Sequence, residues 1–230
     1  MILCKISSPV SEVFQGELTY TTKCSNGHSI NEETNPFWTL HLSLRNNPDD
    51  KTYNVGSSYT CFFEPKSFSG DNMVYCNTCN EKTQAKSVCN MVTFPQILTL
   101  LLRRFDFDYN KMSHFKSDCC VAVPLELPQL ENQNNNYELY GIVNHMGSLR
   151  GGHYTATIRS NDSWYTFNDD VVKAEGQPFA ESKIFESRDA YLLMYRLTDT
   201  TKNAKPCCEK KKNEEGKKKE DEVEKKKTKE

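Results

Sequence analysis

The sequence lacks any hydrophobic run long enough to cross a membrane. A spanning helix needs about 20 consecutive apolar residues, and no stretch of this chain approaches that length. The first five residues are not typical of a secretory signal, because only a short apolar stretch precedes Lys5. We therefore expect an intracellular protein, cytoplasmic or nuclear, that makes no membrane contact.

An excess of basic residues is also missing from most of the chain. The 230 residues include 29 Lys+Arg and 31 Asp+Glu, and residues 202–230 alone contain 12 of the lysines and 8 of the acidic residues. The remaining 201 residues carry a net charge of −6, which argues against nucleic acid as a natural partner. Residues 202–230 have almost no apolar side chains, so we expect a disordered, solvated tail.

Disulfides are not expected in a reduced compartment, so the ten cysteines need another role. Cys76 and Cys79 have the C-x-x-C spacing that binds one tetrahedral ion, and Cys24 with His28 offers two further ligands. One interpretation is a single structural zinc ion held by Cys24, His28, Cys76 and Cys79. The alternative is a strand ribbon that has lost its metal.

The apolar pattern has the period of strands more often than that of helices. Residues 37–44 and 191–195 alternate or form short apolar runs. Residues 97–102 are almost entirely apolar, which predicts a central strand covered on both faces. Short helices are predicted around Ser57 to Phe63 and Phe179 to Phe185. These elements predict an α+β fold that is strongly β-rich.

One predicted hairpin carries a histidine. Residues 147–159 and 164–170 read as two strands joined by a polar turn. If Arg159 pairs with Trp164, the register puts His153 diagonal to Asn168.

The same register puts Asp170 opposite His153, on the face that also carries Asn168. Asp169 is then expected on the other face, because side chains alternate along a strand. A histidine oriented by Asn or Asp is the base half of a nucleophilic site. A surface hairpin with an incidental histidine is the alternative.

Several motifs in order resemble the ubiquitin-specific proteases, a family of papain-like cysteine peptidases that remove ubiquitin. Gly151 to Ala156, followed by Trp164 to Asp169, resembles the family's histidine box. The resemblance covers residues 11–197, and within the family it is greatest to the subgroup around ubiquitin-specific protease 47. Further segments that resemble the family are 14–18, 37–44, 75–79, 93–105 and 190–195.

The resemblance implies a fingers ribbon over about residues 14–92 and a palm sheet over about 93–197, together the C-terminal part of a catalytic domain (1–201). It implies ubiquitin and ubiquitinated proteins as partners. It also implies His153 as general base, Asn168 as its orienting residue and Asp169 as a supporting polar residue.

The family's nucleophile box, G-x-x-N-x-G-x-x-C-Y, does not occur around any cysteine of this sequence. We therefore expect an incomplete papain-like fold that starts near the fingers and lacks the thumb. A base without a nucleophile cannot form an acyl-enzyme, so the chain as given is expected to be inactive.

Three functions remain open at this point. The first is a deubiquitinase domain that hydrolyses ubiquitin isopeptide bonds with a nucleophilic Cys from outside these residues. The second is a catalytically inactive ubiquitin-binding module, and the third is a zinc-ribbon interaction protein unrelated to ubiquitin. The intact histidine box favours the first function, because a binding module has no need for an oriented base. Its residues are His153, Asn168, Asp169 and Trp164.

Overall fold

The computed structural model describes residues 8–44, 52–130, 135–176, 178–179 and 182–198. The chain divides into a unit over Met1–Asp199 and a second unit over Thr200–Glu230. The tail predicted for 202–230 lies outside the described residues, so only the first unit is considered below.

Two short α-helices begin at side-chain caps. In α1 (Pro9–Phe14), Ser8 and Ser11 form a capping box and proline occupies the first turn. In α2 (Val55–Phe63), Oδ1 of Asn54 accepts a hydrogen bond of 2.9 Å from the backbone N–H of Ser57. Helix α2 confirms the helix predicted around Ser57 to Phe63. A 3-10 turn, η1 (Gly70–Asn72), follows.

The second predicted helix, Phe179 to Phe185, is wrong. Within its described residues there is no helix, and Ile184 begins strand β17 (Ile184–Ser187). This strand pairs antiparallel with β12 (Cys120–Pro124), which in turn pairs in parallel with β4 (Thr52–Asn54). A weak helical period therefore yields to long-range strand pairing. Helix α1 was not predicted.

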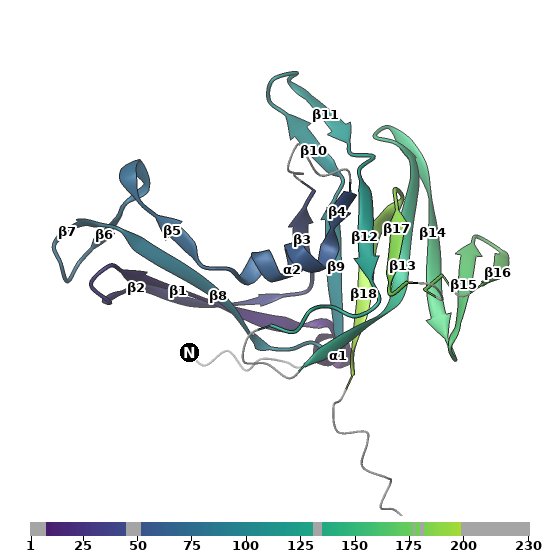
Figure 1. Cartoon of the computed structure of the whole chain (residues 1–230), viewed down its shortest axis with the longest axis horizontal. Coiled ribbons are helices and arrows are strands. Elements are labelled where there is room, and N and C mark those ends of the chain that lie inside the picture. Colours follow the sequence, from purple (N-terminus) through teal and green to yellow (C-terminus); the bar gives the residue numbers. More distant parts are fainter. Residues whose placement is uncertain (1–7, 45–51, 131–134, 177, 180–181, 199–230) are drawn as a thin grey trace, which may run out of the picture. The chain divides into compact units, whose positions relative to one another are not determined.

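The largest sheet has seven strands, which share the right-hand part of Figure 1. Their order is β16-β15-β14-β13-β18-β9-β3. All neighbours pair antiparallel except β9 and β3, which are parallel. The bounds are β3 (Leu40–Ser43), β9 (Ile97–Arg103), β13 (Asn136–Ser148), β14 (Gly151–Ser160), β15 (Ser163–Asn168), β16 (Val171–Glu175) and β18 (Ala190–Thr198).

A four-stranded sheet of order β2-β1-β8-β5 extends to the left in Figure 1. Two hairpins complete the described strands, β6–β7 at the far end of this sheet and β10–β11 beside the seven-stranded sheet. The bounds are β1 (Gly16–Cys24), β2 (Ser29–Phe37), β5 (Lys66–Phe68), β8 (Ala85–Thr93), β6 (Val74–Cys76), β7 (Glu81–Thr83), β10 (Phe105–Asp108) and β11 (Ser113–Lys116). The β-rich α+β prediction is confirmed.

Strand β9 is covered on both faces, as its apolar run predicted, because five of its seven residues are buried. It is not the central strand of its sheet, however. It lies between β18 and the edge strand β3, and β13 is in the middle. An apolar run therefore predicts that a strand is buried, but it does not predict the place of that strand in the order of the sheet.

The junction of β9 and β10 is fixed by a fully buried arginine. Arg104 donates hydrogen bonds to the carbonyl oxygens of Ala190 at 2.6 Å, Cys119 at 2.8 Å, Ser117 at 3.2 Å and Ser187 at 3.5 Å. Burial lowers the pKa of the guanidinium, and nearby acidic groups oppose that shift. The side chain therefore connects the β9–β10 junction to residues 117–119 and to residues 187–190.

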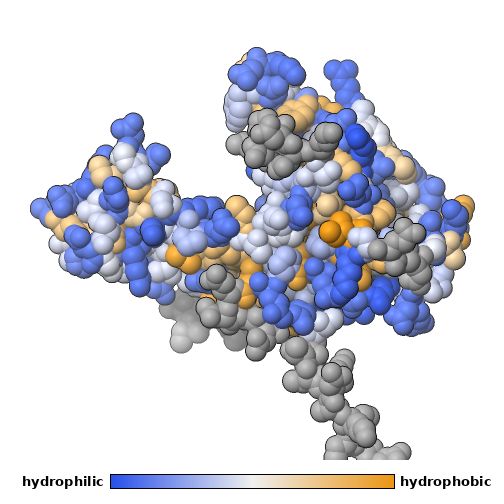
Figure 2. Space-filling view, viewed as in Figure 1, coloured by the Kyte–Doolittle hydropathy of each residue, from blue (hydrophilic) through white to orange (hydrophobic). Residues whose placement is uncertain are grey.

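In the view of Figure 2, the β6–β7 end and the β10–β11 turn are largely hydrophilic. Most of the hydrophobic surface visible in this view lies between them. No helix among the described residues is long and apolar enough to span a membrane.

Candidate functional site

Strands β14 and β15 form the hairpin that the sequence predicted. Arg159 pairs with Trp164, and the register runs regularly to the pair Ala156 and Phe167. The tip is tight, since Asn161 and Asp162 both have positive φ, 47° and 64°. The predicted register is therefore confirmed as far as Phe167.

The hairpin brings His153 and Asn168 into direct contact. Nε2 of His153 lies 2.5 Å from Oδ1 of Asn168. Because an amide oxygen only accepts, Nε2 carries the hydrogen and Nδ1 keeps its lone pair in the neutral ring. Within the described residues Nδ1 makes no hydrogen bond, and the side chain is 45% exposed. This ring can accept a proton from a group placed beside Nδ1.

The sequence-based placement of Asp169 is wrong. Strand β15 ends at Asn168, and Asp169 turns the chain with a φ of 49° before β16 begins at Val171. Alternation no longer applies in a turn, so Oδ2 of Asp169 reaches to 3.9 Å from Nε2 of His153. Asp169 is thus on the same side as Asn168, with a side chain that is 80% exposed.

The predicted pairing of Asp170 with His153 is wrong for the same reason. The β14–β15 ladder stops before either residue, and Asp170 lies in the two-residue turn between β15 and β16.

The strand that carries His153 is packed closely on β13. A Cβ atom added to Gly152 would lie 2.4 Å from both Nε2 of His145 and the carbonyl oxygen of Met146, so only glycine fits there. Gly147, near the end of β13 and opposite Gly152, has a φ of 118° that also favours glycine. Lys116 donates hydrogen bonds of 2.8 Å to the carbonyl oxygens of His145 and Gly147. The hairpin tip before His153 is therefore fixed by close packing at Gly152 and by the hydrogen bonds that Lys116 donates.

His145 lies in an aromatic enclosure beneath this tip. Its ring packs against Tyr154 at 4.7 Å, Phe105 at 5.2 Å and Tyr191 at 6.4 Å between centroids. Burial, and then the charge of Lys116, lower the pKa of His145. His145 is therefore a neutral, buried ring that packs beneath the hairpin tip.

A polar chain crosses three strands of the sheet that carries His153 and Asn168, and no motif in the sequence indicated it. Asn144 donates to Oγ1 of Thr157 at 3.4 Å, and that hydroxyl lies 3.2 Å from Oγ1 of Thr166. Thr157 and Thr166 are directly opposite each other in the ladder. These hydrogen bonds link β13, β14 and β15 at a point four residues along β14 from His153. Only the register, read together with the identity of each residue, could have revealed it.

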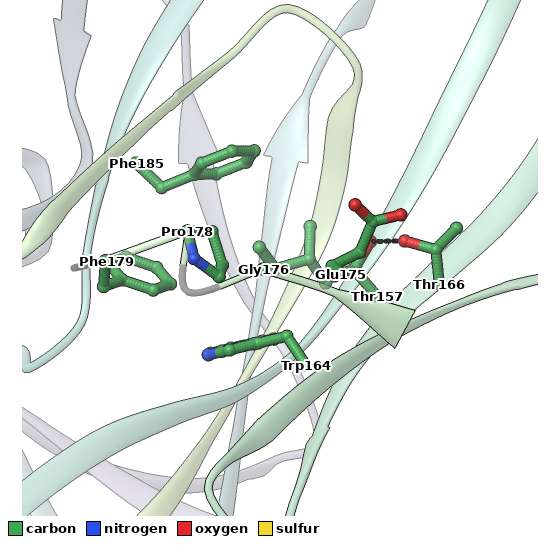
Figure 3. Close-up of a pocket in the computed structure, with 9 residues that line it drawn as sticks. Thr157, Trp164, Thr166, Glu175, Gly176, Pro178, Phe179 and Phe185 are labelled. Carbon is green, nitrogen blue, oxygen red and sulfur yellow. Dashed lines mark hydrogen bonds between the residues drawn. The ribbon is translucent and has the colours of Figure 1, made fainter. Parts of the chain in front are cut away.

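A cavity of about 410 Å³ adjoins the two threonines (Figure 3). The rings of Trp164 and Phe179 pack on one side of it, with 5.4 Å between their centroids. The ring centroid of Phe185 lies 6.0 Å from that of Phe179. Figure 3 shows these rings with Pro178 on the side away from Thr166. None of the described residues that line the cavity is a histidine or cysteine, so we assign it no part in the chemistry.

The four predicted metal ligands meet at one point. The ligand atoms of Cys24, His28, Cys76 and Cys79 all lie within 4.8 Å of one another. Nδ1 of His28 lies 3.2 Å from the sulfur of Cys79, 3.6 Å from that of Cys24 and 3.9 Å from that of Cys76. Ligands on a tetrahedral zinc ion are about 3.5 to 3.8 Å apart for bonds of about 2.0 to 2.3 Å.

Two turns built on positive φ angles shape this cluster. Gly27, with a φ of 84°, lies in the turn from Cys24 to His28, and Asn80, with a φ of 57°, closes the turn that starts at Cys76. The backbone N–H of Cys79 lowers the pKa of the Cys76 thiol to about 6, so a thiolate is available near neutral pH. The residues fit a structural zinc ion of the Cys₃His type.

The sequence model of one family, “Ubiquitin carboxyl-terminal hydrolase”, matches residues 3–195. The chain belongs to this family. The histidine box, the β-rich fold and the cysteine cluster are therefore features of a ubiquitin carboxyl-terminal hydrolase, and the family resemblance read from the sequence is confirmed.

Relatives within the family cover most of this chain. Ubiquitin carboxyl-terminal hydrolase 47 of Mus musculus is 26% identical over 275 aligned residues, which is 85% of this chain and 20% of that protein. Ubiquitin carboxyl-terminal hydrolase 2 of Gallus gallus is 33% identical over 83% of this chain and 53% of its own length. The subgroup around hydrolase 47 fits the motifs. The chain spans a fifth of one relative and about half of the other.

A solved structure is similar to this chain in fold. The SAGA Ubp8/Sgf11/Sus1/Sgf73 DUB module bound to ubiquitin aldehyde matches with a TM-score of 0.65 and 26% identity, over 83% of this chain and 42% of that chain. The hydrolase fold expected from the sequence is thus confirmed, over less than half of that solved chain. Among the described residues, neither nitrogen of His153 contacts a cysteine sulfur.

Proposed function

We propose that this chain is part of a deubiquitinase and supplies the general base for hydrolysis of ubiquitin isopeptide bonds. The contact between Nε2 of His153 and Oδ1 of Asn168 carries the proposal. It orients the imidazole and leaves Nδ1 as the proton acceptor. The family and the neighbour bound to ubiquitin aldehyde support ubiquitin as the partner. The substrates are then proteins that carry ubiquitin.

The nucleophilic cysteine comes from outside these 230 residues. Its thiol gives a proton to Nδ1 of His153, and the thiolate attacks the carbonyl carbon of the isopeptide bond. The C–S bond forms, the C–N bond breaks, and the imidazolium returns its proton to the leaving lysine amine. Water then attacks the thioester with His153 as base, which releases the ubiquitin carboxylate and restores the thiol.

Asn168 and Asp169 have different parts in this scheme. The amide oxygen of Asn168 holds Nε2–H but carries no charge, so it stabilises the imidazolium less than a carboxylate would. Asp169, at 3.9 Å and on the same side, adds a negative charge close to the imidazolium. The two residues together supply orientation and charge.

The remaining parts of the proposal follow from the same assignment. Fingers over about residues 14–92 would hold the zinc cluster, and a palm over about 93–197 would hold His153. The setting would be the cytoplasm or the nucleus.

The test expresses the 230-residue chain alone and extended by any in-frame upstream sequence found in the transcript. Each form is treated with ubiquitin that bears a C-terminal thiol-reactive electrophile. An adduct with the extended form only, and loss of turnover in its His153→Ala variant, is the expected result. If neither form gives an adduct but both bind ubiquitin, the chain is an inactive ubiquitin-binding module.

A further inference from the structure

An open groove lies along strands β1 and β8, far in sequence from the histidine hairpin. It has a volume of about 910 Å³, and twelve of the described residues line it, none of them Asp or Glu. We call it the lysine groove. The lining residues used below are Thr21, Lys23, Ser67, Lys86, Val88 and Asn90.

The lysine groove is on the outer face of the four-stranded sheet. Leu18, Cys89 and Met91 belong to the same two strands and are buried in the core. Their neighbours in sequence, such as Val88 and Asn90, alternate onto the opposite face and line the groove. Residues on this face do not pack in the core and are available to a partner.

Two like charges face each other across the strands of the groove. Lys23 and Lys86 are directly opposite in the antiparallel register, and both are exposed. Like charges in this position destabilise a sheet. No acidic side chain of the described residues forms an ion pair with either lysine, although Glu32 on β2 is opposite the nearby Thr21. The repulsion between the two ammonium groups therefore destabilises the sheet, and no ion pair among the described residues offsets it.

The charge of the groove is opposite to that of the chain around it. Residues 1–201 have a net charge of −6, yet the groove has two cations and no anion. Around the lysines are neutral hydrogen-bonding groups, including the hydroxyls of Thr21 and Ser67 and the amide of Asn90. Such groups can bind the peptide backbone of a ligand while the ammonium groups bind carboxylates.

We propose that the lysine groove binds an acidic polypeptide segment, with Lys23 and Lys86 as the charge-recognising residues. An extended segment matches an open groove along the face of the sheet better than a compact ligand would. Nucleic acid fits less well, because the net negative body repels its phosphates. The site is separate from the proposed catalytic one and does not depend on it.

The probe is a peptide of six glutamates, titrated into the full ¹⁵N-labelled chain and followed by two-dimensional NMR. This readout is needed because the 12 lysines of residues 202–230 also attract acidic peptides. We expect amide shifts at Thr21, Ser67 and Asn90 that weaken as salt is added. Shifts confined to residues 202–230 would overturn the proposal.

Lys86→Glu is the decisive variant, because it places opposite charges face to face with Lys23. We expect about tenfold weaker binding at the groove, together with an unchanged or raised melting temperature. Lys82→Glu makes the same charge change at an exposed β7 position outside the groove and should leave binding unchanged. Equal binding by both variants, or equal loss in both, would contradict the assignment.

Two further measurements keep the result unambiguous. If Lys86→Glu does not fold, Lys86→Gln removes the same ammonium without adding a charge and should weaken binding in the same direction. A single-stranded oligothymidine is titrated under the same conditions. Tighter binding of this oligonucleotide at the groove would replace the acidic polypeptide with nucleic acid and overturn the proposal.

Discussion

The imidazole of His153 and the amide of Asn168 meet at 2.5 Å although fifteen positions separate them in sequence. The register of β14 and β15 makes them diagonal neighbours, and the end of β15 at Asn168 leaves the amide free to turn toward the ring. Orientation of the base is therefore already present in this chain, before any nucleophile is added.

Removal of the amide should release the histidine ring. In Asn168→Ala the hydrogen on Nε2 loses its acceptor, and Asp169 at 3.9 Å is beyond hydrogen-bond distance. We therefore expect ¹⁵N NMR of the His153 ring to change from one tautomer to a mixture of two. Asp170→Ala alters a neighbouring turn residue that has no contact with His153 among the described residues, and should keep the single tautomer. An unchanged spectrum in Asn168→Ala would show that the amide does not orient the base.

Gly152 should not tolerate a side chain. A Cβ atom would lie 2.4 Å from Nε2 of His145, which is itself buried among aromatic rings and cannot move easily. We expect Gly152→Ala to lower the free energy of unfolding by about 1–3 kcal/mol. Gly151→Ala is the matched control, because no atom lies within 4 Å of its added Cβ. Equal melting temperatures for the two variants would contradict this packing.

The zinc cluster should bind one metal ion per chain. We expect metal analysis to give one zinc ion, and both a chelator and Cys76→Ser to remove it and lower the melting temperature. Cys61→Ser changes an exposed thiol outside the cluster and should retain the metal. Full zinc occupancy in Cys76→Ser would exclude this sulfur as a ligand.

Arg104 should contribute to stability through the carbonyl groups it satisfies. Arg104→Met leaves four backbone acceptors without their donor, and each buried unpaired group costs about 1–3 kcal/mol. We expect a large fall in the urea midpoint. Arg103→Met removes an exposed arginine whose ion pair with Asp106 spans 3.7 Å, and should change the midpoint little. Similar losses in both variants would argue against the buried network.

His145 should make the chain less stable in acid. Its pKa is lowered in the folded state, so the unfolded chain binds the proton first as the pH falls below the usual value of about 6.5. Stability from this group is complete above that pH and is lost as the pH falls toward the folded pKa. Lys116 adds to the shift and Asp189 opposes it.

The measurement is thermal unfolding between pH 5.5 and 7.5. His145→Phe keeps an aromatic ring in the enclosure but cannot titrate, so its melting temperature should fall less on acidification than that of the parent chain. His114→Phe, at an exposed position, is the control. A parallel fall in all three proteins would assign the pH dependence to other groups.

Much of this architecture could be read from local patterns. Alternation of apolar residues predicted strands because side chains in a strand point to opposite faces. The turn between Arg159 and Trp164 then fixed the register, and with it the pairing of His153 and Asn168. The spacing of Cys76 and Cys79, with His28 near Cys24, predicted a cluster that the fold assembles.

The sequence by itself determined the strand content, the hairpin register and the ligand types, because each depends on residues close together in the chain. Tertiary structure alone decided that Ile184 begins a strand, that β9 lies beside an edge strand, and that Asp169 turns toward His153. The pairing of β1 with β8 also placed Lys23 directly opposite Lys86. These outcomes depend on which distant segments pair and on where a ladder stops. The free energy of such long-range pairing is shared among segments, so no local pattern encodes it.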